Sequence, residues 1–420
     1  MENKFMAGCF VICLFLCANK SQEKTAEYAA KKTFMDTSLE TTCPFSTTDL
    51  KGNVVISYIN EKNDSVAVMC YNISQDKGHS FGDTIEIPSS KRVHPSAENT
   101  PKIVFKPNGE IIAVWGINNS NPKKKYGGLV YYAQSFDDGR SWSEAKPLVI
   151  DTTSIDQRYF DISILQNGEA GIIWLDSRTQ TDKQGSTLYY AETNGKNGFQ
   201  NEKPIGETTC QCCRTDLFVD GKGNIHAVYR DIIDDSIRDM VHTVSVDGGK
   251  TFFQPKRISE DNWAINGCPH TGPTMAANKD GLHFAWFTAG GEAGVYYCNS
   301  VDNGKQFSPR QLLSTDARHP QMTTLPNGTI GIVWEETVKK DSAFYSKIVL
   351  KLMKPDGQQT KLDVTADDIT ASYPVIISND EKVVFIAWVQ QPNNSKNNSA
   401  ESKNHQAKGK KVFYRTITLE

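Results

Sequence analysis

A short run of alternating apolar residues that closes on an aromatic side chain recurs seven times along the chain. Three clear copies lie at residues 111–115, 225–229 and 330–334, and each follows a turn that contains glycine. The closing residues stand 48 to 59 positions apart and are Tyr58, Trp115, Trp174, Tyr229, Trp286, Trp334 and Trp388. A glycine turn followed by a strand of β-branched and aromatic residues is typical of a β-hairpin. Repeats of this period indicate an array such as a β-propeller, so we predict an all-β fold built from seven hairpin units.

The length and charge of the chain exclude several classes of protein. Its 420 residues suffice for a large core, and 38% of them are hydrophobic. The formal net charge of −3 favours neither nucleic acid nor an anionic membrane surface as a partner. We expect a single propeller domain over residues 41–420, present as a monomer. A polar insertion at 392–410 has no apolar content with which to fold.

The N-terminus has the pattern of an export signal. An apolar stretch at 5–17 follows a short polar start and is too short to span a bilayer. Cys17 at its polar edge resembles the lipidated cysteine of bacterial lipoproteins, and the alternative is a cleaved signal with free release. We therefore predict a signal peptide at 1–17 and an exported protein, either a cell-envelope lipoprotein or a periplasmic or secreted one. Residues 18–40 are polar, and the part at 30–37 is a candidate strand that closes the ring and removes an open sheet edge.

An eight-residue signature follows four of the hairpins. Its form is Ser-x-Asp-x-Gly-x-x-aromatic, and the copies begin at Ser74, Ser135, Ser245 and Ser300. In a tight turn the Asp carboxylate accepts backbone N–H groups, Gly supplies positive φ, and the aromatic ring packs beneath the hairpin. We therefore interpret these aspartates as structural and not as catalytic.

With these signatures the chain resembles the Asp-box, or BNR-repeat, family, whose best-known members are sialidases. The resemblance covers residues 43–420 and implies a β-propeller of four-stranded blades, with the Asp-box between the third and fourth strands. Sialidases of this type have six blades. The seven hairpin units of this chain favour seven blades and leave six as the alternative.

In a propeller the first strand of each blade lines the central channel, so the residues at its opening end should form a ring around one mouth. These residues stand fifteen and sixteen positions before each closing aromatic. They are Thr42, Cys43, Asn99, Thr100, Arg158, Tyr159, Cys213, Arg214, His270, Thr271, Arg318, His319, Ser372 and Tyr373. So many Arg, Cys, His and Tyr residues at one mouth indicate a functional pocket.

The first functional interpretation is a glycosidase-like site for an acidic glycan. The resemblance implies three arginines on the sugar carboxylate, a tyrosine nucleophile with a glutamate partner, and an aspartate acid/base. Guanidinium groups match a carboxylate, and the candidates for substrate binding are Arg158, Arg214, Arg318 and Tyr159. The candidate nucleophile is Tyr373, its partner is Glu335 or Glu98, and the acid is Asp156 or Asp161. The family's Arg-Ile-Pro motif of an early blade is replaced here by Asn99-Thr100-Pro101.

The second interpretation is a metal or thiol site. Seven cysteines follow Cys17, an odd number that cannot pair completely outside the cytoplasm. Thiolates with imidazole suit Cu(I) or Zn(II), and the candidate ligands are Cys210, Cys212, Cys213, Cys268, His270 and His319. A disulfide from Cys210 or Cys212 to Cys268, or unpaired thiols, are the alternatives. A third class of function is a non-catalytic binding scaffold on the cell surface, because fold does not fix function.

Overall fold

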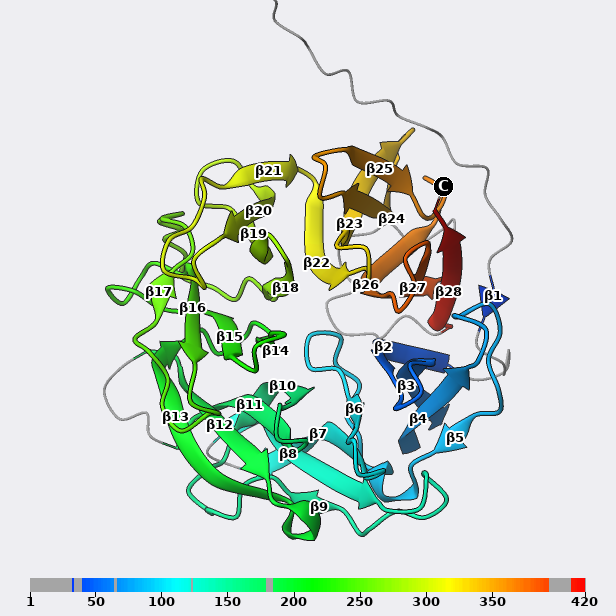
Figure 1. Cartoon of the computed structure of the whole chain (residues 1–420), viewed down its shortest axis with the longest axis vertical. Coiled ribbons are helices and arrows are strands. Elements are labelled where there is room, and N and C mark those ends of the chain that lie inside the picture. The colour runs from blue at the N-terminus through cyan, green and yellow to red at the C-terminus, as the bar shows by residue number, and fades with distance from the viewer. Residues whose placement is uncertain are drawn as a thin grey trace, which may run out of the picture.

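The computed structural model describes residues 32–33, 40–63, 66–121, 124–178, 184–392 and 409–419 (Figure 1). The predicted signal peptide at 1–17, most of the segment at 18–40 and the insertion between 392 and 409 lie outside these residues. Strands dominate the described part, whose helices are two short 3₁₀ turns, η1 (Pro88–Ser90) and η2 (Gly195–Asn197). None of its helices is long and apolar enough to cross a membrane. The prediction of an all-β fold is confirmed.

Five separate sheets have four antiparallel strands each, in chain order. The first contains β2 (Glu40–Thr48), β3 (Val54–Asn63), β4 (Val66–Ser74) and β5 (Ile85–Glu86), and the second contains β6 (Lys102–Phe105), β7 (Ile111–Asn121), β8 (Lys124–Ser135) and β9 (Lys146–Pro147). The third contains β10 (Gln157–Ile164), β11 (Ala170–Asp176), β12 (Ser186–Thr193) and β13 (Phe199–Thr209). The fourth contains β14 (Asp216–Val219), β15 (Ile225–Arg230), β16 (Met240–Ser245) and β17 (Lys256–Arg257), and the fifth contains β18 (Thr274–Asn278), β19 (Gly281–Thr288), β20 (Gly294–Ser300) and β21 (Gln311–Ser314).

A larger sheet completes the ring. It contains β22 (Ala317–Thr324), β23 (Ile330–Lys340), β24 (Ala343–Met353) and β25 (Gln359–Asp363), followed by β26 (Thr370–Ile377), β27 (Val383–Gln391), β28 (Lys411–Thr418) and β1 (Lys32–Thr33). Its two groups of four strands meet at a single parallel pair, Ser346 with Thr370. β1 pairs with β28, so the first described strand lies beside the last one (Figure 1).

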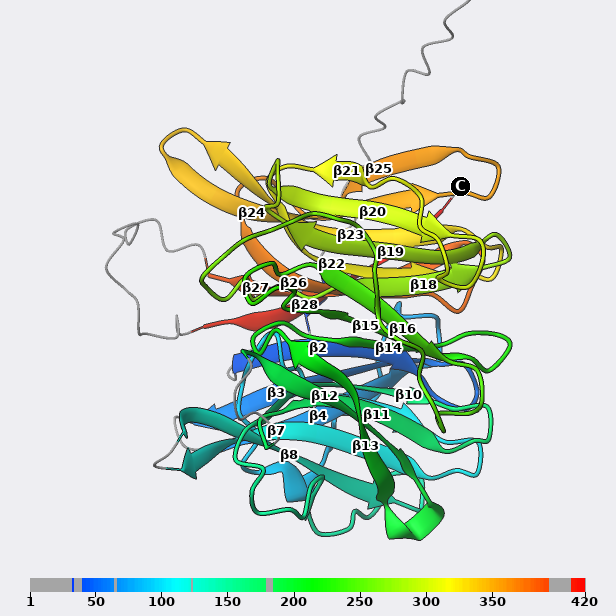
Figure 2. The same cartoon turned by 90° about the vertical axis from the view of Figure 1, so that its left-hand side faces the viewer.

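The sheets are arranged around a common centre, as in a β-propeller. The first strands, β2, β6, β10, β14, β18, β22 and β26, surround this centre (Figure 1). In the side view, strands of neighbouring sheets run from one face of the ring toward the other (Figure 2). The opening ends of the seven first strands are therefore collected around one channel.

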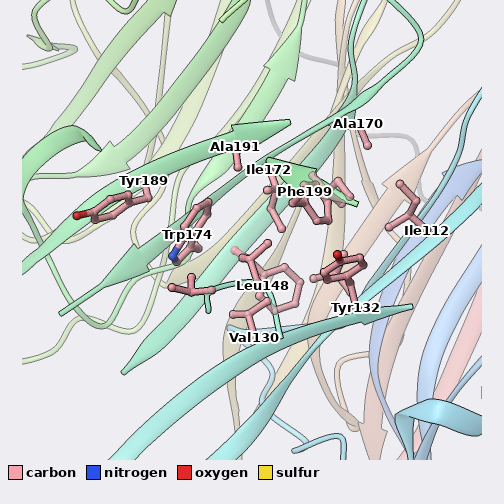
Figure 3. Packing of buried hydrophobic residues seen from close by; sticks show 14 of the residues in the cluster. Ile112, Val130, Tyr132, Leu148, Ala170, Ile172, Trp174, Tyr189, Ala191 and Phe199 are labelled. Atoms are coloured by element: carbon pink, nitrogen blue, oxygen red, sulfur yellow. The ribbon is translucent and has the colours of Figure 1, made fainter. Parts of the chain in front are cut away.

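The hydrophobic core is divided into clusters that lie between neighbouring sheets. One cluster joins Ile172 and Trp174 of β11 to Val130 and Tyr132 of β8 and to Leu148 (Figure 3). The closing tryptophans of the repeat are at most 1% exposed, and they are Trp115, Trp174, Trp286, Trp334 and Trp388. Each large aromatic side chain buries about 150–250 Å². The repeated aromatic therefore holds one sheet against the next.

The Asp-boxes form the turns after the third strands, and their hydrogen bonds are local. In the first copy Ser74 Oγ accepts the N–H of Gly78 at 2.7 Å and donates to Asp76 at 2.8 Å. Asp76 in turn accepts the N–H of Ser80 at 2.7 Å. The other copies repeat these bonds at Asp137, Asp247 and Asp302. These carboxylates therefore serve the turn, as the sequence predicts.

The Asp-box glycines also set the spacing between sheets. Gly139 has a φ of 81°, and a side chain there would collide with the hydroxyl of Tyr71 from β4 of the preceding sheet. Gly304 is placed in the same way against the ring of His242 from β16. Glycine is required at these positions because the backbone is left-handed and the neighbouring ring occupies the space of a Cβ atom.

Candidate functional site

The ring encloses a cavity of about 400 Å³ at its centre. All seven first strands, or the residues just before them, contribute to its wall. The ionisable side chains of this wall are Lys102, Asp161, Arg214, Asp216, His319 and Tyr373. A cavity of this size fits a single small ligand, because ligand pockets typically measure about 300–1,000 Å³.

A repeated backbone irregularity marks the mouth of the channel. The pairing of four first strands with their second strands is interrupted at this position. In each gap one non-glycine residue is left-handed, namely Cys43 (φ 55°), Tyr159 (φ 54°), His319 (φ 51°) and Tyr373 (φ 51°). Non-glycine residues rarely adopt this conformation, and bulges of this kind redirect side chains near functional sites. The chain thus repeats a left-handed residue at the opening end of four first strands, and at two of them, His319 and Tyr373, the side chain lines the cavity.

Arg214 and Glu98 form a buried ion pair at the mouth. Arg214 Nη1 lies 3.0 Å from Glu98 Oε1, and the two residues are only 9% and 7% exposed. Arg214 Nη2 donates to the carbonyl oxygens of Pro320 at 2.5 Å and Gly272 at 3.4 Å. Glu98 Oε2 is buried without a hydrogen-bond partner among the described residues. Burial raises the pKa of Glu98, although Arg214 and His319 oppose this effect.

His319 is held between two acceptors. Its Nδ1 lies 2.9 Å from Glu335 Oε1, and its Nε2 lies 3.1 Å from the carbonyl oxygen of His270. Nε2 can donate to the carbonyl oxygen, and the Glu335 carboxylate near Nδ1 can form an ion pair with a protonated ring, so these neighbours favour the imidazolium form. Burial disfavours this charge, but the hydrogen bond to Glu335 and the charges of Glu335 and Glu98 raise the pKa of His319 above its usual range.

The Tyr373 ring packs against the His319 ring, with centroids 4.3 Å apart and ring planes tilted by 31°. Its backbone N–H donates to Glu335 Oε2 at 3.0 Å, so Glu335 connects the two rings. Burial first, and then the charges of Glu98 and Glu335, raise the pKa of Tyr373. The phenol is therefore neutral in the unliganded protein.

A second polar group lies further along the channel wall. Lys102 Nζ donates to the carbonyl oxygen of Phe160 at 2.8 Å and lies 3.6 Å from Asp161 Oδ1. Burial and then the Asp161 carboxylate raise the pKa of Asp216 to about 7. Burial lowers the pKa of Lys102. Lys102 is the first residue of β6 and is followed by three apolar residues, so the strand pattern alone did not indicate a buried ammonium group here.

The three arginines proposed from the sequence do not converge. Arg214 lies at the mouth, as described above. Arg158 is partly exposed and, like Arg318, lies outside the cavity wall. Its Nη2 lies 2.7 Å from Asp156 Oδ2, and its guanidinium lies 5.5 Å from the centre of the Tyr159 ring. Arg318 is exposed and does not line the cavity; its guanidinium lies 5.2 Å from the centre of the Phe287 ring. Arg318 directly precedes His319, whose side chain does line the cavity.

The structure brings only some of the proposed metal ligands close together. The sulfur atoms of Cys210, Cys212 and Cys213 lie within 4.8 Å of one another, and all three residues are buried. Hydrogen bonds from the other two cysteines lower the pKa of Cys210, and Arg230 and Arg238 add to this effect. Within the described ranges this group includes neither Cys268 nor His270, both of which are exposed. His319, the remaining proposed ligand, is engaged with Glu335 instead. The seven cysteines after Cys17 are free thiols in the structure.

Comparisons with known proteins agree with this architecture. Residues 60–386 match the BNR repeat-like domain. A Dyadobacter fermentans DSM 18053 protein of unknown function is similar over 96% of this chain and 99% of its own, with 12% identity and a TM-score of 0.50. The intramolecular trans-sialidase from Ruminococcus gnavus, in complex with oseltamivir carboxylate, is similar over 76% of this chain and 95% of its own, with 10% identity and a TM-score of 0.50. No curated protein matches the chain. At these identities the structural likeness shows the fold alone, and the family match covers most of the sequence. The chain belongs to the BNR repeat-like family and has a sialidase-like propeller fold.

Proposed function

We propose that this protein recognises a carboxylated glycan at the mouth of its central channel. The observation that carries the proposal is the cluster of Arg214, Glu98, His319, Glu335 and Tyr373 at the opening of a 400 Å³ cavity. Arginine and imidazolium donors bind carboxylates, and the Tyr373 ring offers an apolar face to a sugar. The family resemblance adds a precedent for sugar binding at this place in the fold.

The ligand carboxylate is assigned to the remaining donors of Arg214 and to Arg158, which lies outside the cavity wall but is close enough to Cys212, two residues before Arg214, to interact with its charge. Arg158 donates to Asp156 through Nη2, and among the described residues it makes no other hydrogen bond. Arg214 has five N–H groups, of which three point to Glu98, Pro320 and Gly272. The two residues therefore keep unused N–H groups, which is the arrangement required to bind an anion in a preformed site.

Recognition is favoured over hydrolysis by the state of Tyr373. A tyrosine nucleophile needs a base that removes its proton, whereas burial and two carboxylates raise the pKa of this phenol. Among the described residues no hydrogen bond joins the Tyr373 hydroxyl to Glu98 or Glu335, and Glu335 instead contacts His319 and the backbone N–H of Tyr373. The same cluster is thus better suited to hold a sugar than to attack one.

The test compares Arg158→Ala with Arg318→Ala. The ligands are α2,3-sialyllactose and oligogalacturonate, with neutral lactose as the control, and affinity is measured by isothermal titration calorimetry. Loss of one charged hydrogen bond weakens binding by about 1.5–3 kcal/mol, which is roughly 10- to 150-fold. Arg158→Ala should show this loss, and Arg318→Ala, whose guanidinium lies over Phe287, should bind like the wild type. Equal effects of the two substitutions, or equal binding of lactose, would refute the proposal. Release of sialic acid from sialyllactose by the wild type would refute recognition without hydrolysis.

We further infer that the ring has seven blades and that the protein is exported. The blade count treats the larger sheet as two blades, because one residue pair joins its halves. Export rests on the apolar segment at 5–17 and lipidation on Cys17. Sensitivity of processing to globomycin supports lipidation, and processing that is unaffected by the drug contradicts it.

A further inference from the structure

Three buried thiols form a compact group beside the mouth. Cys210, Cys212 and Cys213 lie between the end of β13 and the start of β14. Their sulfur atoms are within 4.8 Å of one another, and those of Cys210 and Cys212 are 3.4 Å apart. The three residues are at most 3% exposed, and Ile232 packs against them. The three thiols are therefore shielded from water, and the apolar side chain of Ile232 covers part of them.

The spacing of the sulfur atoms fits a metal ion. Thiolate sulfur binds metals such as zinc at about 2.3 Å, so three sulfurs around one ion lie about 4 Å apart. The three thiols are already close to this separation before any ion is bound. They come from four consecutive positions of one loop, so no rearrangement between sheets is needed to bring them together.

The ligand set distinguishes between metals. A structural zinc site takes four ligands, whereas no imidazole or carboxylate of the described residues joins this group of three thiols. The burial of the group also leaves little room for water as a fourth ligand. Soft thiolate ligands select Cu(I), and an ion that is satisfied by three thiolates matches the set that the structure provides.

Two arginines supply the charge balance that such a site requires. Three thiolates around Cu(I) carry a net charge of −2, and an unpaired buried charge is costly. Arg238 Nη1 lies 3.5 Å from Cys210 Sγ. Arg230 adjoins the group, because its carbonyl oxygen accepts the N–H of Cys210 at 2.8 Å and its guanidinium donates to the carbonyl oxygen of Arg238 at 2.8 Å. Two fixed positive charges thus adjoin three potential thiolates.

We propose that Cys210, Cys212 and Cys213 bind one Cu(I) ion as a three-coordinate thiolate site next to the channel mouth. Cys213 directly precedes Arg214, so the bound ion holds the loop from which Arg214 reaches Glu98. The site involves no redox step and no residue of the glycan cluster as a ligand. It is independent of the glycan proposal, and either can fail alone.

The experiment loads the purified full-length protein with Cu(I) under anaerobic, reducing conditions, in competition with bathocuproine disulfonate. The expected stoichiometry is one ion per chain. X-ray absorption at the copper edge should show sulfur neighbours at about 2.3 Å, by analogy with other metal–thiolate bonds. Loss of supporting groups around a metal costs 10- to 100-fold in affinity, so Cys212→Ser, which removes a ligand, should cost more than about 100-fold.

Cys268→Ser is the matched control, because this cysteine is exposed and lies outside the group. It should bind Cu(I) like the wild type. Several results would overturn the proposal: no Cu(I) bound by the reduced wild type, equal losses in the two variants, oxygen or nitrogen neighbours at the copper edge, or Zn(II) displacing Cu(I) in direct competition. The absorption measurement uses the wild type, so it decides the question even if Cys212→Ser fails to fold.

Discussion

Replacing Arg214 by methionine should destabilise the protein more than any single loss at the channel mouth. The substitution keeps much of the side-chain volume and removes the guanidinium. It leaves Glu98, which is 7% exposed, without its partner at 3.0 Å. It also leaves the carbonyl oxygens of Pro320 and Gly272 without their donor. These three acceptors come from different parts of the ring, so Arg214 links segments that are far apart in the sequence.

The magnitude follows from the burial of the pair. Removal of one partner of a buried ion pair costs about 3–5 kcal/mol, because the remaining charge is uncompensated. Glu98→Gln removes that charge and keeps an oxygen acceptor, so it should cost less, about 1–3 kcal/mol. The double variant, which combines Arg214→Met with Glu98→Gln, contains no unpaired buried carboxylate. The double variant should therefore be more stable than the sum of the single losses predicts, by about 2 kcal/mol.

The assay is urea unfolding followed by tryptophan fluorescence and circular dichroism. Measurements at pH 5 and pH 8 add a second test. Burial already raises the pKa of Glu98, and loss of Arg214 should raise it further above its unfolded value. A carboxyl group whose pKa is raised on folding stabilises the folded state at low pH. This contribution is lost as the pH rises through the pKa of the folded state. Arg214→Met should thus lower the free energy of unfolding more at pH 8 than at pH 5. Single losses that add within about 0.5 kcal/mol, with no dependence on pH, would refute the reasoning.

Two further predictions concern the fold. Gly139→Ala should cost about 1–3 kcal/mol, because a left-handed residue gains a Cβ atom that meets the Tyr71 hydroxyl. Gly52→Ala, with a φ of 77° and open space around it, isolates the backbone part of that cost, so equal unfolding midpoints for the two variants would contradict the packing argument. Asp216 has a pKa of about 7, well above the value of 3.8 expected when unfolded, so its contribution to stability is present below pH 3.8 and lost as pH rises through 7. Asp216→Asn should remove this pH-dependent loss of stability, which is worth about 1–2 kcal/mol for a partly exposed group. If the free energies of unfolding of the wild type and the variant change in parallel between pH 5 and 8, the prediction is wrong.

The fold could be predicted because its determinants are local and repeated. The hairpin turns, the closing aromatics and the Asp-box hydrogen bonds each depend on a few neighbouring residues. The bonds from Ser74 to Gly78 and from Asp76 to Ser80 form within one turn. Interactions of this range can be derived from a single sequence.

The site was predicted less completely, because strand direction and bulges decide which side chain faces the channel. The repeat identified the pair Arg318 and His319 but not which residue faces inward. The structure places His319 in the wall and Arg318 outside. Glu335 was expected beside Tyr373, and it binds the backbone N–H of Tyr373 rather than its hydroxyl.

The thiol group shows a similar limit. Cys210, Cys212 and Cys213 are gathered by one short loop. Cys268 and His270 precede β18, outside any named strand, so the hairpin pattern does not fix their direction. The sequence pattern grouped six candidate ligands, and the structure brings three of them together.

The central claim is that one channel mouth, formed by the opening ends of the first strands, is where the ligand binds. Hydrogen exchange measured by mass spectrometry, with and without saturating α2,3-sialyllactose, tests it directly. The account predicts slower exchange in peptides that contain Tyr159, Arg214, His319 and Tyr373, and no change in the Asp-box turns at the outer ends of the sheets. Protection confined to the Asp-box turns, or to the exposed surface around Arg318, would contradict it.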